Sequence, residues 1–277
     1  YWNYGGIWPL TNEGEQVFCG EIFHGIEAGA HRRGYAIVLG FTSRDHWREQ
    51  TYLEILNSRR ADGLIIVDPQ VRKQVESGAR GPVPIVQLLD APAGAAATVR
   101  IDDAAAAAEV TRHLIGLGHR RIAHVRGACP SFAAERRLTG YHQALDAAGI
   151  AYDETLVIHA DYSYAAGSMA IDALMALPKP PTAVFCANDT MALGALWRCK
   201  QLGLSVPGSI SIAGIDDIYS ASISDPPLTT VRQPRQEIGA AGVDMLISML
   251  EGRRGVAREI VLPHEVVVRS STAAPHS

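Results

Sequence analysis

The 277-residue sequence has no apolar run that approaches the roughly 20 residues a helix needs to span a bilayer. Its first ten residues, YWNYGGIWPL, contain no Lys or Arg and therefore lack the charged start of a signal peptide. Because a leader is removed from an exported chain, this second absence is weak evidence. We expect a chain that does not cross a membrane.

Cysteine is scarce and long basic runs are missing. The four cysteines, Cys19, Cys129, Cys186 and Cys199, form no CxxC pair. Free thiols in a reducing compartment are therefore favoured over a disulfide scaffold or a metal site. The formal net charge is −4, so this stretch by itself does not resemble a surface that grips a phosphate backbone.

Signatures of an enzyme are also missing. The sequence has neither a GxSxG nucleophile motif nor a GxxxxGK[ST] phosphate loop. The stretch GLGHRR at 116–121 resembles a dinucleotide loop, but it lacks the third glycine and joins a helix to a strand, which is the wrong order. The histidines, including His113, His119 and His124, are not spaced as metal ligands. We therefore expect no enzyme activity, no cofactor and no metal.

What the sequence does contain is a regular alternation of short apolar segments and longer amphipathic segments. The continuous apolar character of the short segments is typical of parallel strands that are covered on both faces. Asp102 or Asp103 is placed to cap one of the helices, and Gly116 or Gly118 to end it. We predict strands at 35–41, 62–68, 84–90, 98–101, 120–127, 154–160, 182–187 and 209–215, and helices at 47–60, 102–118, 134–149, 164–176 and 190–202.

The number of strands favours two lobes rather than one. About ten strands are too many for a single parallel sheet of ordinary size, whereas two doubly wound α/β lobes fit the length of the chain. No Pro- or Gly-rich linker divides the sequence. We therefore expect the chain to pass between the lobes at strand ends.

Polar side chains stand where several predicted strands end. Asn188 and Asp189 follow one apolar strand and Asp90 ends another. Asp216 and Asp217 follow a third. Ligands of parallel α/β sheets bind beyond the carboxyl ends of the strands, which favours a binding role. The alternative is that these side chains only cap helices, but a helix needs one cap, and capping explains Asp189 more readily than Asn188.

The residue types suit a polyhydroxylated ligand. Carboxylates accept hydrogen bonds from hydroxyl groups, an amide both donates and accepts, and the guanidinium of Arg137 donates in a fork. Tyr162 and Trp8 have rings that can stack on a sugar or a base. The basic stretch ERR at 135–137 leaves a phosphorylated or acidic sugar open as well.

Six segments, in this order, resemble the effector-binding core of the lactose- and galactose-repressor (LacI/GalR) family of transcription regulators. The resemblance runs from about residue 20 to residue 271. The segments are RRADGLIIV (59–67), HLIGLGHRRIAHVRG (113–127), RRLTGYHQALDAAGI (136–150), PTAVFCANDTMALGALW (181–197), GLSVPGSISIAGIDD (203–217) and DPPLTTVRQPRQEIGAAGVDML (225–246).

The resemblance implies a fold of the type shared with periplasmic sugar-binding proteins. Two Rossmann-like lobes with parallel sheets would be joined by three crossovers, near 126–128, 231–233 and 262–264. The N-terminal lobe would comprise residues 1–126 and 234–261. The C-terminal lobe would comprise residues 127–233 and 262–277. An effector would bind in the cleft between the lobes.

Site residues follow from the resemblance, position by position. Arg137 matches the arginine that holds the effector, Asn188 matches the asparagine of the A-N-D motif, and Asp216 matches the first aspartate of G-[YFI]-D-D. The pair after the strand would then divide its roles, with Asn188 facing the ligand and Asp189 capping the helix. The implied effector-binding set is Asp90, Arg137, Tyr162, Asn188, Asp216 and Gln233.

Two departures from the family pattern stand out. The helix-turn-helix domain and hinge helix that normally precede the core are absent from this sequence, so we expect a core without its DNA-binding domain. The segment 5–27, GGIWPLTNEGEQVFCGEIFHGIE, lacks the N-P-F-F motif that members show after their first strand. This part normally supplies effector contacts, which leaves the roles of Trp8, Asn12, Glu13 and Phe18 open.

The implied function is that of the ligand-sensing core of a cytoplasmic, homodimeric transcription repressor. Its partners would be a sugar-like effector and, through the missing domain, operator DNA. A purine-like ligand is the alternative effector, and a solute-binding protein of a sugar transport system is the alternative class. The last residues, RSSTAAPHS, have no apolar heptads, so we expect no tetramer built by a C-terminal coiled coil.

Overall fold

The structure is a computed structural model in which the chain divides into two units. It describes residues 13–38, 57–58, 61–67, 69–78, 83–92 and 94–275. Unit 1 comprises residues 1–101 and 234–262, and unit 2 comprises residues 102–233 and 263–277. Most of the predicted helix at 47–60 lies outside the described residues, as do residues 39–41 of the strand predicted at 35–41. Trp8 and Asn12 also lie outside them.

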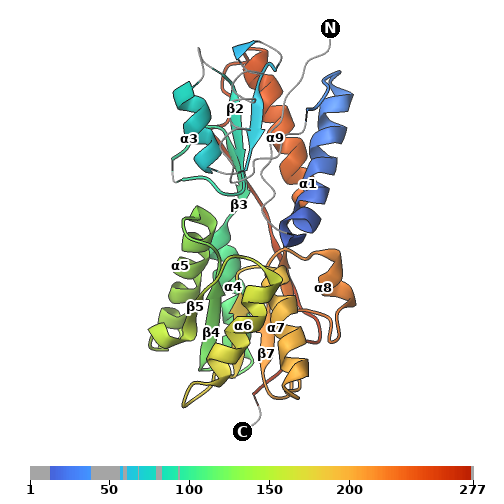
Figure 1. Ribbon diagram of the computed structural model, residues 1–277. Coiled ribbons are helices and arrows are strands. Elements are labelled where there is room, and N and C mark those ends of the chain that lie inside the picture. Colours follow the sequence, from blue (N-terminus) through green and yellow to red (C-terminus); the bar gives the residue numbers. More distant parts are fainter. Residues whose placement is uncertain are drawn as a thin grey trace. The chain divides into compact units, whose positions relative to one another are not determined.

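The described residues of unit 1 form a four-stranded parallel sheet in the order β1-β2-β3-β9. Helices α1 and α9 pack against each other, and α9 lies along β2 and β3. Figure 1 shows α3 on the opposite side of this sheet from α9. The described elements of unit 1 are α1 (Glu13–Arg32), β1 (Leu64–Ile66), α3 (Pro69–Gly78), β2 (Ile85–Leu88), β3 (Thr98–Ile101), α9 (Arg235–Leu250) and β9 (Glu259–Leu262).

Unit 2 contains a second four-stranded parallel sheet, in the order β5-β4-β6-β7. The pairs α4–α5 and α6–α7 cover its faces (Figure 1). Its core strands β4 and β6 are buried along their whole length, including His124 and Arg126 of β4, as parallel strands covered on both faces are. These elements are α4 (Asp103–Gly116), β4 (Ile122–Arg126), α5 (Phe132–Ala147), η1 (Glu154–Leu156), β5 (Val157–His159), α6 (Tyr164–Met175), β6 (Ala183–Cys186), α7 (Asp189–Gln201) and β7 (Ser211–Ala213).

A short antiparallel pair completes unit 2. It joins β8 (Thr230–Arg232) to β10 (Glu265–Val267), and α8 (Tyr219–Ile223) precedes it. The segment after β10 returns to the sheet, where the Ser271 hydroxyl donates to the carbonyl of Ile212 (2.6 Å) and accepts from the Thr229 amide (2.8 Å). The segment around Ser271 is therefore bonded into the core of the unit.

The first boundary between the units differs from the one that the sequence predicted. The prediction ended the first lobe after Arg126, whereas the structure ends that part of unit 1 at Ile101. The strand β4 pairs with β5 and β6, and β3 pairs with β2 and β9. The sequences of β3 and β4 both mix apolar and polar residues, so the local pattern does not decide which sheet each strand joins. Partners that lie far away in the sequence decide it. The chain changes unit again after Gln233 and after Leu262.

A glycine allows the close approach of α4 and α5, the helices that carry Asp103, Arg136 and Arg137. A Cβ atom on Gly140 would lie 2.0 Å from the carbonyl oxygen of Ala104. Only glycine therefore permits α5 to pack this closely on α4. This close approach brings the side chains of Arg136 and Arg137 on α5 to Asp103 on α4.

None of the helices among the described residues has the length and apolar character that crossing a membrane requires.

Candidate functional site at the carboxyl edge of unit 2

The strand order of unit 2 locates its natural ligand position. The chain leaves β4 for β5 on one side and then returns to β6 on the other side of β4. In parallel α/β sheets, ligands bind at the carboxyl ends of the two strands where the order reverses. In this unit those strands are β4 and β6, which end at Arg126 and Cys186.

Arg137 lies at this point and is held from two sides. Its Nε donates to Asp103 Oδ1 (3.0 Å), its Nη2 pairs with the same oxygen (2.9 Å), and its Nη1 donates to the carbonyl of Ala187 (2.5 Å), directly after β6. Burial disfavours the charged guanidinium, but the charges of Asp103, Tyr162 and Asp216 and the hydrogen bond to Asp103 together outweigh burial and raise the pKa of Arg137. Arg137 is therefore a fixed cation with an engaged N–H on each nitrogen, and each Nη retains a second N–H.

The structure gives the helix cap to Asn188 and not to Asp189. Asn188 caps α7, because its Oδ1 accepts from the amide of Met191 (2.9 Å). Its Nδ2 donates to the carbonyl of Tyr162 (3.1 Å) and keeps a second N–H. The prediction that Asp189 caps the helix is wrong. A cap residue must have extended backbone, and Asn188, with φ −146° and ψ 167°, is the last extended residue before the helix.

Asp189 is instead fully buried inside the unit. Its Oδ1 accepts from the hydroxyl of Thr230 (2.5 Å) and its Oδ2 from the amide of Ile218 (3.1 Å). Burial, and after it the charge of Asp216, raises the pKa of Asp189 to about 8. The side chain therefore joins α7 to β8 and to the turn after β7, and has no surface of its own to offer a ligand.

Tyr162 closes the β4 side of the site. Its phenolic oxygen lies 3.3 Å from the hydroxyl of Ser131, which caps α5. A Cβ atom on Gly127 would lie 1.9 Å from the Tyr162 ring, so the ring rests on the backbone just after β4. Tyr162 itself has φ +69°, an uncommon conformation for a tyrosine.

Asp216 and Gln233 form the other corner of the site. Gln233 Nε2 donates to Asp216 Oδ1 (2.8 Å), and both residues are buried. The second polar atom of the amide, Gln233 Oε1, is buried and has no hydrogen-bond partner among the described residues. A buried carbonyl oxygen without a donor is costly, which makes this atom a natural acceptor for a ligand.

Of the six predicted site residues, the structure places five in unit 2 and one in unit 1. Contacts inside unit 2 join Asn188 to Tyr162 and Asp216 to Gln233, and the charge of Asp216 also acts on Arg137. Asp90 belongs to unit 1, two residues after the end of β2.

Sequence reasoning missed Asp103 and Ser131. Asp103 appeared only as one of two possible caps, and Asp102 is the cap, since its carboxylate accepts from the amides of Ala104 and Ala105. Since one carboxylate is enough to cap a helix, the second aspartate could have been predicted to bind a partner elsewhere in the chain. Asp103 takes two arginines, Arg136 and Arg137, with only 3% of its side chain exposed.

His119 and His124 contact other residues of the protein core and are not arranged as metal ligands. His124 is buried between the rings of Phe185 (4.6 Å between centroids) and Tyr141 (5.3 Å), and burial lowers its pKa to about 3. His119 bonds Thr182 and the carbonyl of Ala273. Within the described part of the chain, no three His, Cys, Asp or Glu side chains lie close enough to hold a metal ion.

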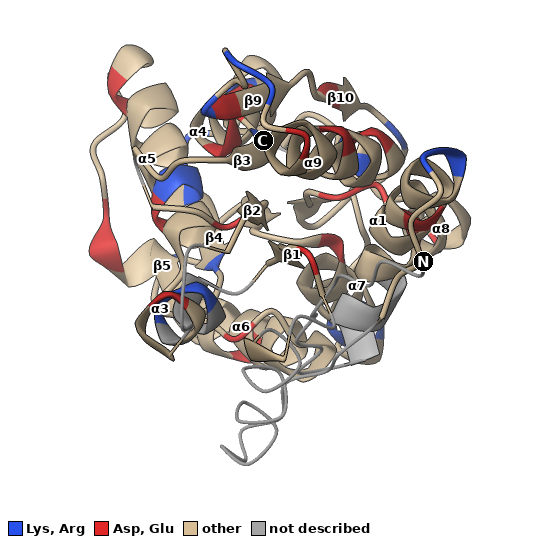
Figure 2. Cartoon of the chain, turned by 90° about the horizontal axis from the view of Figure 1, so that it is seen from above, with Lys and Arg blue, Asp and Glu red and all other residues tan. Residues whose placement is uncertain are grey.

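Charges on the described helices are mixed in sign. Figure 2 shows Lys and Arg segments interspersed with Asp and Glu segments. Many of them are paired within one unit, as Arg33 is with Asp244 and Arg198 with Asp172. The described surface therefore offers no single broad basic field for a polyanion.

Comparisons with known proteins agree with this architecture. The family of periplasmic binding protein-like domains matches residues 111–272. The transcriptional repressor CytR of Escherichia coli K12 is 35% identical over 259 residues, which cover 93% of this chain and 76% of that protein. The chain belongs to the LacI family of transcription regulators.

Solved structures of LacI-type regulators have the same fold. A LacI family regulator from Mycobacterium smegmatis is 31% identical and superposes with a TM-score of 0.88, covering 99% of this chain and all of the other. The regulator CelR, solved in complex with cellobiose, is 29% identical with the same TM-score of 0.88, covering 97% of this chain and 84% of that one. These likenesses identify the chain as a ligand-sensing regulator with an α/β, periplasmic-binding-protein-like core.

Proposed function

We propose that this chain is the effector-sensing part of a cytoplasmic LacI-type repressor and that a sugar or sugar derivative binds at the carboxyl edge of the unit 2 sheet. In the complete homodimeric protein, the bound effector would change the affinity for operator DNA. It can do so only by binding one conformation of the protein more tightly than another. The chain would have no catalytic activity of its own.

One observation carries the choice of ligand. The Arg137 corner presents N–H donors that no described residue engages, from both Nη atoms and from Asn188 Nδ2. The Asp216 corner presents acceptors, which include the unpartnered Gln233 Oε1. A hydroxyl group both donates and accepts, so a molecule with several hydroxyls satisfies both corners at once. The cellobiose bound by the related regulator CelR supports the same ligand class.

A second effector class has support from one residue. The ring of Tyr162 is fixed against the backbone at Gly127 and is partly exposed, as a stacking surface for a purine-like base would be. A base has few hydroxyls and would leave the acceptor corner less well satisfied. The sugar therefore remains our first choice.

The test is a thermal-shift screen with cellobiose, glucose 6-phosphate, glucuronate, adenosine and adenine. A ligand at a hundred times its dissociation constant stabilises the folded chain by about 2.7 kcal/mol, which gives a measurable rise in Tm. We expect a selective rise with a sugar. A rise with adenosine or adenine alone would replace the sugar by a base, and binding by none of the five would contradict this choice of ligand classes.

Arg137→Ala sharpens this screen. We expect it to weaken binding of the stabilising compound at least tenfold, or about 1.4 kcal/mol, as measured by calorimetry. The variant should fold, because Arg136 still neutralises Asp103. Arg136→Ala is the matched control, since it removes the other, more exposed arginine from the same carboxylate and should leave binding unchanged. Equal affinities for the two variants would remove Arg137 from the site.

A further inference from the structure

Two consecutive aspartates after β7 have backbone conformations that residues other than glycine rarely adopt. The φ angles are 134° at Asp216 and 55° at Asp217. Such residues persist only where their surroundings hold them in place. The turn at 216–217 therefore needs a source of support, and that support decides where the Asp216 carboxylate points.

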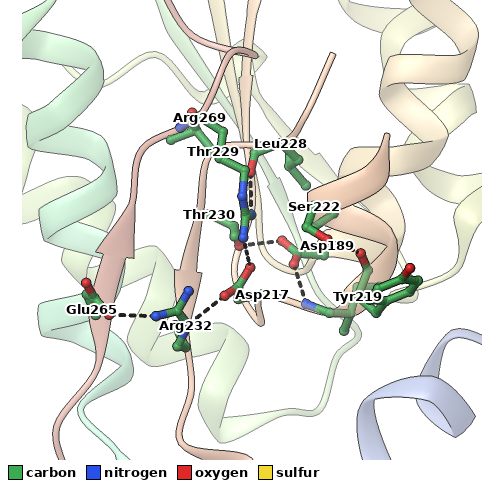
Figure 3. Close-up of polar contacts among 12 residues, drawn as sticks. Asp189, Asp217, Tyr219, Ser222, Leu228, Thr229, Thr230, Arg232, Glu265 and Arg269 are labelled. Carbon is green, nitrogen blue, oxygen red and sulfur yellow. Dashed lines mark hydrogen bonds and ion pairs between the residues drawn. The ribbon is translucent and has the colours of Figure 1, made fainter. Parts of the chain in front are cut away.

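The backbone of the turn is anchored at both ends. The amide of Asp216 donates to the carbonyl of Val231 on β8 (2.8 Å), and the amide of Ile218 donates to Asp189 Oδ2 (3.1 Å). The middle of the turn is held through the side chain of Asp217. Its Oδ2 accepts from Arg232 Nε (2.7 Å) and its Oδ1 from Arg269 Nη2 (2.5 Å), as Figure 3 shows.

Two neighbouring residues of the turn thus pair with the last residue of β8 and the residue that follows it. Asp216 bonds Gln233, and Asp217 bonds Arg232. Arg232 also pairs with Glu265 on β10 (2.9 Å; Figure 3), and Arg269 donates to the carbonyl of Leu228 (2.8 Å). The first pair belongs to the candidate ligand site. The second pair is attached to the two strands through which the chain enters and leaves unit 2.

We propose that Asp217 is a positioning residue for the effector site, which holds the Asp216 carboxylate in place through its ion pairs with Arg232 and Arg269. This inference rests on the proposed function, because Asp216 is an effector contact only there. Both oxygens of Asp217 are engaged by arginines and only 8% of its side chain is exposed, so it acts through Asp216 and not by touching a ligand. Burial alone would raise the pKa of Asp217, but its hydrogen bonds to Arg269 and Arg232, together with the charges of these two arginines, outweigh burial and lower the pKa.

The first test needs no ligand. Asn is the residue other than Gly that best tolerates a φ near 55°, so Asp217→Asn removes the charge and keeps the backbone preference. We expect hydrogen exchange at the amides of Asp216 and Ile218 to accelerate at least tenfold in this variant, and the ¹³C signal of the Asp216 carboxyl to shift. Amides of β4 and β6 should keep their protection, which a general loss of stability would not permit.

Two further variants complete this test. Arg232→Gln should give the same local change and serves if Asp217→Asn fails to fold, because Arg232 is half exposed. Glu265→Gln is the matched control, since it removes the other partner of Arg232 without touching Asp217, and it should leave the Asp216 amide protected. Unchanged exchange at Asp216 in folded Asp217→Asn or Arg232→Gln protein overturns the proposal.

The ligand arm distinguishes this proposal from the proposed function. With cellobiose, glucose 6-phosphate, glucuronate, adenosine or adenine, whichever stabilises the unaltered chain, we expect Asp217→Asn to weaken binding at least tenfold and Glu265→Gln no more than twofold. If none of these compounds binds, the proposed ligand classes fail, while the exchange data still decide whether Asp217 positions Asp216. Equal affinity in Asp217→Asn and unaltered protein contradicts the positioning role even where the ligand is found.

Discussion

Two clusters in unit 2 each consist of one buried aspartate and two arginines, but the residue that each cluster presents to the proposed ligand differs. In the Asp103 cluster, one buried carboxylate receives Arg136 and Arg137. In the Asp217 cluster, one buried carboxylate receives Arg232 and Arg269. In the first, a buried arginine is the group offered to the proposed ligand, and the aspartate holds it. In the second, both arginines hold the aspartate, and its neighbour Asp216 is the group offered.

The difference lies in what happens when a partner is lost. Arg137 has 8% of its side chain exposed and cannot reach solvent, so its charge depends on Asp103. Arg232 is 50% exposed and can be solvated without Asp217. The Asp103 cluster is therefore a matter of stability as well as binding, whereas the Asp217 cluster is chiefly a matter of local geometry.

The largest effect should come from Asp103→Ala. Removing the carboxylate leaves the buried charge of Arg137 without compensation, which costs about 3–5 kcal/mol of unfolding free energy. Urea denaturation followed by circular dichroism measures this loss. Asp146→Ala, an exposed aspartate on α5, is the control and should change stability by less than about 0.5 kcal/mol. A loss of 1 kcal/mol or less for Asp103→Ala would mean that the Asp103 cluster contributes no more to stability than the Asp217 cluster does.

A smaller effect is expected in the pH dependence of stability, which should have opposite signs for Asp189 and Asp217. The pKa of Asp189 is raised from 3.8 to about 8, so the folded chain binds this proton more tightly than the unfolded chain does. The resulting stability is complete below pH 3.8 and is lost as the pH rises through about 8. The pKa of Asp217 is lowered, so its contribution is lost in the opposite direction, as the pH falls into the acid range.

Melting curves between pH 6 and 9 test the Asp189 side. We expect Tm to decline over this range and Asp189→Asn to flatten the decline. Asn can accept from the Ile218 amide and donate to the Thr230 hydroxyl, so it replaces the protonated carboxyl with little change in shape. Identical slopes in the two proteins would mean that Asp189 is ionised throughout.

The smallest effect is expected from Glu265→Gln. Glu265 is 68% exposed and its partner Arg232 is 50% exposed, so solvent screens the pair. We expect a loss below about 0.5 kcal/mol in urea denaturation. A loss above 1 kcal/mol would show that the outer part of the Asp217 cluster carries stability after all.

Much of the fold could be predicted because local pattern and tertiary structure agree. The strand predicted at 98–101 is β3, and the helices predicted at 164–176 and 190–202 are α6 and α7 to within a residue. The division into units could not be predicted in the same way at its first boundary. The partner of β3 at the edge of its sheet is β9, which lies more than 150 residues later, and no local pattern reports that pairing.

The candidate site could be predicted as a set of positions but not as a set of contacts. Residue type and the place after a strand were enough to single out Asn188 and Asp216. The cap role of Asn188 depends on backbone angles. The burial of Asp189 depends on its hydrogen bond to Thr230, which lies 41 residues further along the chain. Asp103 was missed for the same reason, since its arginines lie on another helix.

The return of residues 269–273 into unit 2 has a consequence for synthesis. Ser271 bonds Ile212 and Thr229, and Ala273 bonds His119, so the polar core of this unit is incomplete until these residues are made. The sheet of unit 1 likewise lacks its edge strand until 259–262 has emerged. Neither unit can therefore finish folding before the ribosome has added these late segments. A nascent chain that is stalled earlier exposes unpaired strand edges in both units.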